Sequence, residues 1–413
     1  MHCVSRGREL LQESTMLNER IPVFDVDTHW SEPGDIWESR APAKYKGQVL
    51  HIKEKPDGSQ AWYVGDQWVY WAGSSVIDKN SQRVLQTVSL SHFDDIAPSC
   101  YDPKARVAMM DVQGISNQII YPNVIGFGAQ TLMKVSSDTK LRHWHVTAYN
   151  DALAEMQKAG SRRLLPQAAL PLWDMDATLN ELHRAREKLG LTGIAMSDKP
   201  ADFGQKPLTD PIWDRFFATC QDLALPINFH IASGTWEGDL SEWWSEDKMM
   251  FRAGGKLNGP LAVYQSLKLF MNNMSDIANL VLLGVCEKYP RLKFVSVESG
   301  ASWIPFVVQG MEYFWEQLMT DSERAAFKRS PRETFIDQIY ASYWFENKNA
   351  VEFFIKDLGP DNLMLETDFP HPMSLWGNVH EKIKETLSGF SEEVQRKICY
   401  QNAEKVYGVS VHR

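Results

Sequence analysis

Asp25, Asp27 and His29 alternate along a short apolar segment near the start of the chain. If this segment is a strand, residues two apart point to the same side, so the three side chains share one face. Carboxylates on a buried face are unfavourable unless charge compensates them, and a divalent metal bound by Asp27 and His29 would supply that charge. Asp25 lies deeper and is expected to orient a ligand rather than bind the metal. The Asp-x-His pattern alone is a weak motif.

Other apolar segments of the chain end in the same kinds of residue. His230 ends Pro-Ile-Asn-Phe-His, Glu298 ends Phe-Val-Ser-Val-Glu, and Asp368 and His371 follow Leu-Met-Leu-Glu-Thr. A single histidine after an apolar strand is usually structural, but repeated strand ends of this kind indicate one shared site. Imidazole and carboxylate ligands suit zinc, manganese or iron, and the sequence does not choose among these metals.

The segments that carry these residues belong to a repeat, in which a short β-branched apolar run is followed by an amphipathic stretch of helical length. The runs are residues 23–29, 117–123, 164–171, 193–198, 225–233, 293–299, 339–347 and 362–369. About eight such runs are the number that closes a TIM barrel. Helical stretches include residues 176–189 and 211–223, and Asp210 is a candidate N-cap of the second. We therefore predict an α/β fold, a distorted (β/α)8 TIM barrel over residues 22–409, preceded by an extension of residues 1–21.

Two stretches are longer than the repeat of one strand and one helix requires. Residues 45–102 contain alternating segments and predict a β-rich insertion after the first strand, and residues 233–256 predict a lid-like insertion after the fifth. Both leave from the carboxyl ends of strands, where barrel active sites form, so we expect them to cover the barrel mouth. Several of the 15 tryptophans lie in these stretches, and such residues line apolar pockets or pack beneath loops. Trp30 and Trp303 are the candidate substrate-binding residues.

The composition excludes several other classes of protein. Of the 413 residues, 44% are hydrophobic and 23% are charged, as in an ordinary globular enzyme. The net charge of -10 argues against nucleic acid or an anionic membrane as a partner. We expect a soluble, cytoplasmic protein, because no apolar run could span a bilayer and the first residues lack a signal peptide's apolar core. The five cysteines show no CxxC spacing and suit reduced thiols. Met16 is a candidate for the true start of the protein.

Together these motifs resemble a known family. The chain has Asp-x-Asp-x-His at the first predicted strand, His at the fifth, an acid-base residue at the sixth and Thr-Asp-Phe-Pro-His at the eighth. Further matching segments are residues 106–111, 149–151, 162–163, 300–305, 402–403 and 407–408. From about residue 22 to residue 409, the sequence is similar to the amidohydrolase-related family that includes aminocarboxymuconate-semialdehyde decarboxylase. The resemblance implies a homodimeric enzyme with one divalent metal, zinc or manganese, with iron or a second metal as alternatives. The implied metal ligands are Asp27, His29, His230 and Asp368.

Two positions depart from the pattern of the family. Asp27 stands where the decarboxylases have histidine or glutamate, a change that keeps a metal ligand. Glu298 stands where they have the histidine that acts as acid-base catalyst. A carboxylate at this position could move a proton, bind a second metal, or be a structural group behind Trp303.

The residues and the resemblance predict metal-assisted hydrolysis or non-oxidative decarboxylation of a small, apolar or aromatic carboxylate, amide or lactone. Asp368, Glu298 and His371 are the candidate catalytic residues. In hydrolysis Asp368 would take a proton from water, and in decarboxylation Asp368 or Glu298 would protonate the carbon that loses carbon dioxide.

Two alternative functions belong to other classes of protein. A monooxygenase with two iron ions, or with iron and manganese, could use the same side chains as ligands. A non-catalytic scaffold is the third alternative. Metal content discriminates between the two enzymes, because one equivalent of zinc or manganese favours the hydrolase or decarboxylase, and two equivalents with iron favour the oxygenase.

Overall fold

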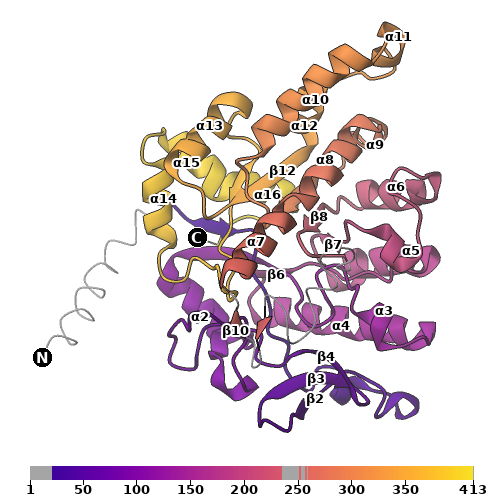
Figure 1. The fold of residues 1–413 in the computed structure, drawn as a ribbon, viewed down its shortest axis with the longest axis vertical. Helices are drawn as coiled ribbons and strands as arrows, with labels where there is room; N and C mark the ends of the chain where they lie inside the picture. The colour runs from indigo at the N-terminus through magenta and orange to yellow at the C-terminus, as the bar shows by residue number, and fades with distance from the viewer. Residues whose placement is uncertain (1–20, 235–250, 253–255, 258, 413) are drawn as a thin grey trace, which may run out of the picture.

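A ring of short parallel strands forms the centre of the molecule, with helices on its outside (Figure 1). The computed structural model describes residues 21–234, 251–252, 256–257 and 259–412. The strands of the ring are β1 (Val23–Asp25), β5 (Ile115–Ile120), β6 (Leu164–Pro166), β7 (Ile194–Met196), β8 (Ile227–His230), β11 (Phe294–Val297), β12 (Ile339–Tyr343) and β13 (Leu363–Leu365). Each of them overlaps one of the apolar runs predicted from the sequence, although the observed strands are shorter.

Two parallel sheets make up this ring, one in the order β1-β5-β6 and the other in the order β13-β12-β11-β8-β7. Parallel bridges join the sheets at both edges. Ala168 pairs with Ile194 between β6 and β7, and Thr28 pairs with Phe369 just beyond β1 and β13. Strands that follow one another along the chain are therefore neighbours in the ring, as in a TIM barrel. The predicted distorted (β/α)8 barrel is confirmed.

Helices between successive strands cover the outside of the barrel. The longer ones are α2 (Pro103–Gln113), α4 (Thr139–Ala159), α5 (Met175–His183), α6 (Asp214–Asp222), α8 (Asn272–Leu282), α10 (Ile304–Leu318), α12 (Pro331–Gln338), α13 (Lys348–Leu358) and α14 (Val379–Leu387). Shorter ones are α3 (Leu132–Val135), α9 (Val285–Lys288), α11 (Asp321–Arg324), α15 (Glu392–Arg396) and α16 (Asn402–Tyr407). Apolar side chains of these helices and of the strands form one main core between the two layers.

The two helices predicted in detail are present, with changes at their ends. Asp210 caps the 3-10 turn η8 (Pro211–Trp213), which leads into α6, so the predicted N-cap is confirmed. The stretch predicted over residues 176–189 begins one residue earlier at Met175, and its second half is the π-helix η6 (Arg184–Leu189).

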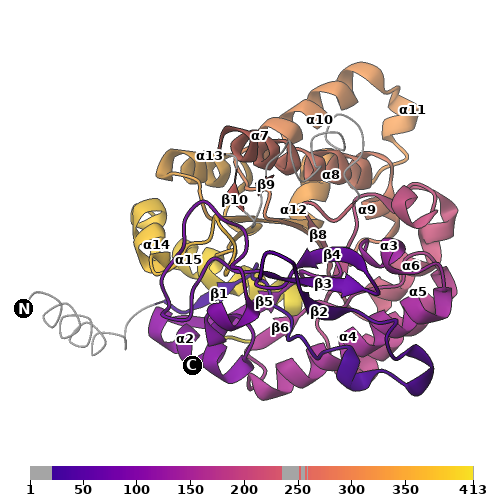
Figure 2. The ribbon, with the colours of Figure 1, turned by 60° about the horizontal axis from the view of Figure 1, so that its bottom comes forward.

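The insertion over residues 45–102 contains an antiparallel sheet of β2 (His51–Glu54), β3 (Gln60–Val64) and β4 (Gln67–Trp71). Figure 2 turns the molecule so that this sheet comes forward. The rest of the insertion is bonded to loops at the carboxyl ends of two barrel strands. Ser31 Oγ donates to Ser74 O at 2.8 Å, and Val76 N donates to Pro370 O at 3.1 Å. The β-rich character is thus confirmed, and the insertion lies against the end of the barrel where its strands terminate.

Most of the second predicted insertion, residues 233–256, lies outside the described residues. Its described part includes the short antiparallel pair β9 (Phe251–Arg252) and β10 (Lys256–Leu257), and α7 (Gly259–Phe270) follows. The predicted extension of residues 1–21 is described at residue 21 only. Among the helices of the described ranges, none has the length and apolar character needed to cross a membrane.

A layer of polar side chains lies inside the barrel below the strand ends. Asn228 of β8 donates through Nδ2 to Gln167 Oε1 and to Ile194 O, both at 2.9 Å. Its Oδ1 accepts from the Tyr407 hydroxyl at 2.8 Å. Asn228 is two residues before His230 and points to the same side of the strand. The hydrogen bonds of Asn228 therefore hold β8 in register with β6 and β7, which fixes the position of His230.

The substitution Asn228→Asp tests this layer. It removes both donors and places a carboxylate against two oxygens that can only accept, so the free energy of unfolding should fall by about 3 kcal/mol or more. Asn347→Asp is the matched control, because exposed Asn347 caps α13 and aspartate caps a helix equally well. Urea denaturation followed by circular dichroism measures both changes. Equal stability of the two variants would show that the layer does not hold β8.

Candidate active site

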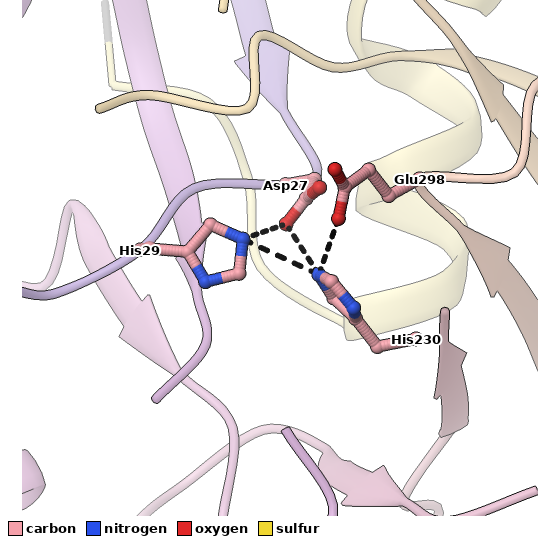
Figure 3. A group of neighbouring side chains, drawn as sticks. All are labelled: Asp27, His29, His230 and Glu298. Carbon is pink, nitrogen blue, oxygen red and sulfur yellow. Dashed lines mark hydrogen bonds and ion pairs between the residues drawn. The ribbon is translucent and has the colours of Figure 1, made fainter. Parts of the chain in front are cut away.

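Four side chains from the ends of three barrel strands converge at the carboxyl end of the ring (Figure 3). Asp27 and His29 follow β1, His230 ends β8, and Glu298 follows β11. His230 Nε2 lies 3.5 Å from Asp27 Oδ1, 3.4 Å from Glu298 Oε2 and 3.3 Å from His29 Nε2. One ligand atom from each of the four lies within 4.8 Å of the others. The sequence placed these residues at strand ends, and the fold brings them together.

Asp368 and His371 complete the group from the loop after β13. Asp368 Oδ1 lies 3.6 Å from His29 Nε2 and 2.8 Å from His371 Nδ1. The His371 ring stacks on the His29 ring, with the centroids 3.7 Å apart. His29, Glu298, Asp368 and His371 form a second set whose ligand atoms lie within 4.8 Å of one another. All six metal or catalytic residues chosen from the sequence therefore share one site, while their individual roles stay predictions.

The carboxylates of this site suit a bound cation. Both carboxylate oxygens of Asp27 and of Asp368 are buried and accept no hydrogen bond. Burial is the largest cause that raises the pKa of each carboxyl; the charge of Asp368 adds to it for Asp27, and that of Glu366 for Asp368. Buried carboxylates of this kind are stabilised when a positive charge replaces their lost hydration.

The imidazoles also suit a metal, because they are uncharged near neutral pH. Burial lowers the pKa of His230 to about 4. Burial, followed by the charges of His371 and His230, lowers the pKa of His29 well below its ordinary value. A neutral imidazole keeps a lone pair that can bind a metal. Together with the carboxylates, these rings form a mixed nitrogen and oxygen ligand set that fits a divalent metal.

Glu298 and Asp368 share an unusual backbone conformation. Glu298 directly follows β11, Asp368 lies three residues after the end of β13, and each has φ of 56°, in the left-handed region that non-glycine residues rarely adopt. Asp368 N donates to Asp27 O at 2.9 Å, and Glu298 N donates to Glu366 Oε2 at 3.2 Å. Backbone strain of this kind persists where the surrounding structure holds it, and it concentrates at functional sites.

Asp25 lies below the cluster and holds the loop that carries Asp368. It accepts from Thr367 N at 2.8 Å, from Thr367 Oγ1 at 2.6 Å and from Gln118 Nε2 at 2.9 Å. Burial raises the pKa of Asp25 to about 6. Arg106 Nη1 donates to the carbonyl oxygen of His29 at 2.7 Å. These contacts agree with the expectation that Asp25 orients a ligand-bearing segment.

Three residues at the site were not chosen from the sequence. Glu366 is fully buried and lies in electrostatic contact with Asp27 and Glu298. Strand alternation could have found it, because it lies two residues before Asp368. The Phe127 ring lies 4.1 Å from that of His230 and 4.8 Å from that of His29. Asn123 contacts His371. Phe127 and Asn123 follow β5 in a loop whose path has no signal in the sequence.

The two tryptophans chosen as substrate-binding residues donate hydrogen bonds to backbone carbonyl oxygens. Trp30 is 5% exposed, and its Nε1 donates to Tyr101 O at 2.9 Å. Trp303 is half-buried, and its Nε1 donates to Ser299 O at 3.0 Å. Neither indole N–H is therefore left for a substrate, although the rings could still contact one. Their role as substrate-binding residues stays a prediction.

Comparison with known proteins agrees with this geometry. 2-Amino-3-carboxymuconate-6-semialdehyde decarboxylase of Dictyostelium discoideum is 22% identical over 323 residues, which is 78% of this chain and 80% of that protein. The crystal structure of an amidohydrolase from Mycobacterium avium subsp. paratuberculosis K-10 superposes with a TM-score of 0.71 at 19% identity, covering 94% of this chain and 100% of the other.

A second solved structure is dihydroxybenzoic acid decarboxylase from Polaromonas sp. JS666, with bound manganese and the inhibitor 2-nitroresorcinol. Its TM-score is 0.59 at 16% identity, covering 94% of this chain and 97% of that one. At these identities, both solved structures show a shared fold.

The sequence model of the amidohydrolase family matches residues 25–409. This range begins at Asp25 in β1, passes through every barrel strand and includes all the ligand-type side chains of the cluster. The match thus spans the complete barrel and its site, and the chain belongs to the amidohydrolase family.

Proposed function

We propose that this protein is a metal-dependent, non-oxidative decarboxylase of small aromatic carboxylates. The observation that carries the proposal is the buried cluster in which the unbonded carboxylate oxygens of Asp27 and Asp368 lie beside neutral histidines. The Dictyostelium and Polaromonas proteins described above are both decarboxylases by name. Hydrolysis would use the same cluster, but these relatives favour decarboxylation. They give no support to the oxygenase alternative.

The proposed metal ligands are Asp27, His29, His230 and Asp368. When bound there, a divalent cation would supply positive charge to hold the substrate carboxylate and a neighbouring oxygen. Manganese is the first metal to test, because the Polaromonas enzyme binds it, and zinc is the second.

Glu298 is the proposed source of the proton that replaces the lost carboxyl group. Burial, and next the charge of Asp368, raise the pKa of Glu298, so this carboxyl holds a proton more readily than a carboxyl in water does. In the reaction the proton from Glu298 adds to the ring carbon that bears the carboxylate. The bond between that carbon and the carboxylate then breaks, its electron pair restores the aromatic ring, and carbon dioxide leaves. Glu298 regains a proton from solvent.

Aromatic side chains near the cluster support an aromatic substrate. Phe127 is partly exposed and packs against the rings of both His29 and His230, so it offers an apolar wall beside the proposed metal. Burial, and next the charges of Glu32 and Glu298, raise the pKa of Tyr70 in β4, which agrees with a position of this strand near the cluster. We propose on this basis that the insertion over residues 45–102 covers the barrel mouth.

A homodimer and a cytoplasmic location are also proposed. The resemblance to the family supports the dimer. Apolar side chains that stay exposed on α10 also support it, among them Phe306 at 74% and Leu318 at 76%, since large exposed apolar patches mark association sites.

His230→Ala and Asp368→Asn test the metal site. Each variant should lose metal and turnover while it keeps its fold, because side chains at strand ends serve the site more than the core. Metal content is measured by plasma mass spectrometry beside circular dichroism. His183→Ala and Asp222→Asn are matched controls at exposed positions, with side chains 53% and 73% exposed. Full metal loading with normal turnover in either site variant would remove that residue from the assignment.

Glu298→Gln tests the proton donor. Glutamine keeps the shape of the side chain and the strained backbone but removes the titrating proton, so turnover should fall by about a hundredfold to ten-thousandfold. Metal content should stay unchanged if Glu298 is an acid at a site with one metal. Loss of metal together with activity would instead make Glu298 a ligand, and an unchanged rate would leave it a structural role. Exposed Glu385→Gln is the control.

A panel of aromatic carboxylates tests the reaction itself. The protein loaded with manganese or zinc is incubated with hydroxybenzoates and aminobenzoates and with matched amides and esters, and carbon dioxide and acid release are followed together. We expect carbon dioxide from a carboxylate that carries a neighbouring oxygen, and none with His230→Ala. Acid release from an amide or ester without carbon dioxide would overturn decarboxylation in favour of hydrolysis.

A further inference from the structure

Asn123 lies in the turn after β5 with 2% of its surface exposed, and its side-chain amide contacts two fixed groups. Nδ2 donates to the carbonyl oxygen of Trp30 at 3.0 Å, and Oδ1 lies 2.9 Å from Nε2 of His371. A backbone carbonyl can only accept, so the end of the amide beside Trp30 must be the NH2 group. The other end is then an oxygen that can only accept, and His371 Nε2 must carry the ring hydrogen that it receives.

The contact at Nε2 determines what His371 presents at its other nitrogen. A neutral imidazole carries one ring hydrogen, so Nδ1 has a lone pair when Nε2 is protonated. Nδ1 lies 2.8 Å from Asp368 Oδ1, and neither oxygen of Asp368 accepts a hydrogen bond. Stacking on His29, with 21° between the ring planes, fixes the rotation of the ring.

We propose that Asn123 is a positioning residue that holds His371 in the tautomer with hydrogen on Nε2, so that Nδ1, which lies beside Asp368, carries a lone pair. This proposal rests on the proposed function, because His371 lies against Asp368, a proposed metal ligand of that site. The other tautomer would set the Nε2 lone pair against the Asn123 oxygen and put the ring hydrogen on Nδ1. Asn123 would thus decide whether the site contains an acceptor or a donor at this point.

Asn123 is itself held from beneath by a buried carboxylate. Glu32 Oε1 accepts from Asn123 N at 2.8 Å, from Val124 N at 3.2 Å and from the Tyr149 hydroxyl at 3.1 Å. The two backbone bonds fix the turn, and the carbonyl of Trp30 fixes the amide. His29 immediately precedes Trp30 in the chain, so Asn123 ties the loop of a proposed metal ligand to the ring of His371. Partners of this kind hold ligating or catalytic histidines in one orientation.

The experiment compares Asn123→Leu, which has a similar volume but no acceptor, with Asn123→Asp, which keeps an oxygen toward Nε2. The proteins are reconstituted with zinc, and the tautomer of His371 is determined from the nitrogen chemical shifts of 15N-labelled histidine. The signal of His371 is identified by its absence in His371→Gln. Wild type and Asn123→Asp should show hydrogen on Nε2, whereas Asn123→Leu should show a mixture or the reverse tautomer.

Kinetics provide the second readout. In Asn123→Leu, kcat should fall by about tenfold to a hundredfold, with KM within about twofold of wild type and metal content unchanged. Asn123→Asp should recover at least part of the rate. Asn123→Ala removes the acceptor without introducing a larger apolar group and replaces the leucine variant if circular dichroism shows that the latter is unfolded.

The proposal is overturned if the variants without an acceptor keep the wild-type tautomer, or if their kcat is unchanged. The nitrogen shifts require no substrate, so they decide the role of Asn123 even if the wild-type protein fails to decarboxylate any acid of the panel. Failure of the proposed function and failure of this inference are therefore distinguishable.

Discussion

Burial of carboxylates at the carboxyl end of the barrel is the constraint on which the rest of the structure depends. Asp25, Asp27, Glu298, Glu366 and Asp368 are each at most 5% exposed. A carboxylate removed from water needs hydrogen bonds or opposite charge to replace its hydration. Asp25 receives hydrogen bonds from Thr367 and Gln118, whereas the oxygens of Asp27 and Asp368 receive none. Hydrogen bonds from the protein thus replace the lost hydration of Asp25, whereas Asp27 and Asp368 require a bound cation to replace theirs.

The scaffold makes this arrangement tolerable by fixing the backbone on every side. The strained φ of Glu298 is held by a hydrogen bond from its backbone N–H to the Glu366 carboxylate, and that of Asp368 by one from its N–H to the carbonyl oxygen of Asp27. Asn228 and its partners hold the strand that ends in His230. The side chains of the cluster therefore need not reorganise to meet a cation, and such preorganisation is the main contribution of a protein to catalysis at a charged site.

Much of the barrel could be predicted from the sequence, because buried parallel strands are continuous apolar runs that differ plainly from amphipathic helices. Asp27 and His29 could be assigned to one face because strand alternation is a fixed geometry. Strand alternation also predicts that Glu366 faces the site, because it lies two residues before Asp368. Asn123 and Phe127 could not be found in this way, because the path of the loop after β5 depends on tertiary contacts such as the bonds from Glu32. The choice between decarboxylase and oxygenase was also beyond the sequence, since Glu298 is a suitable residue for either.

Because the pKa values of the buried ligand carboxyls are raised, metal binding and proton release are parts of one equilibrium. Burial and the charges of neighbouring carboxylates raise the pKa of the proposed ligands Asp27 and Asp368, so each binds a proton more readily than a carboxyl in water does. A cation that enters must displace those protons, and its apparent affinity consequently rises with pH. The acidity of the surrounding compartment and its supply of free metal then act on the same balance. A modest acidification would favour the metal-free protein even where the metal concentration stays constant.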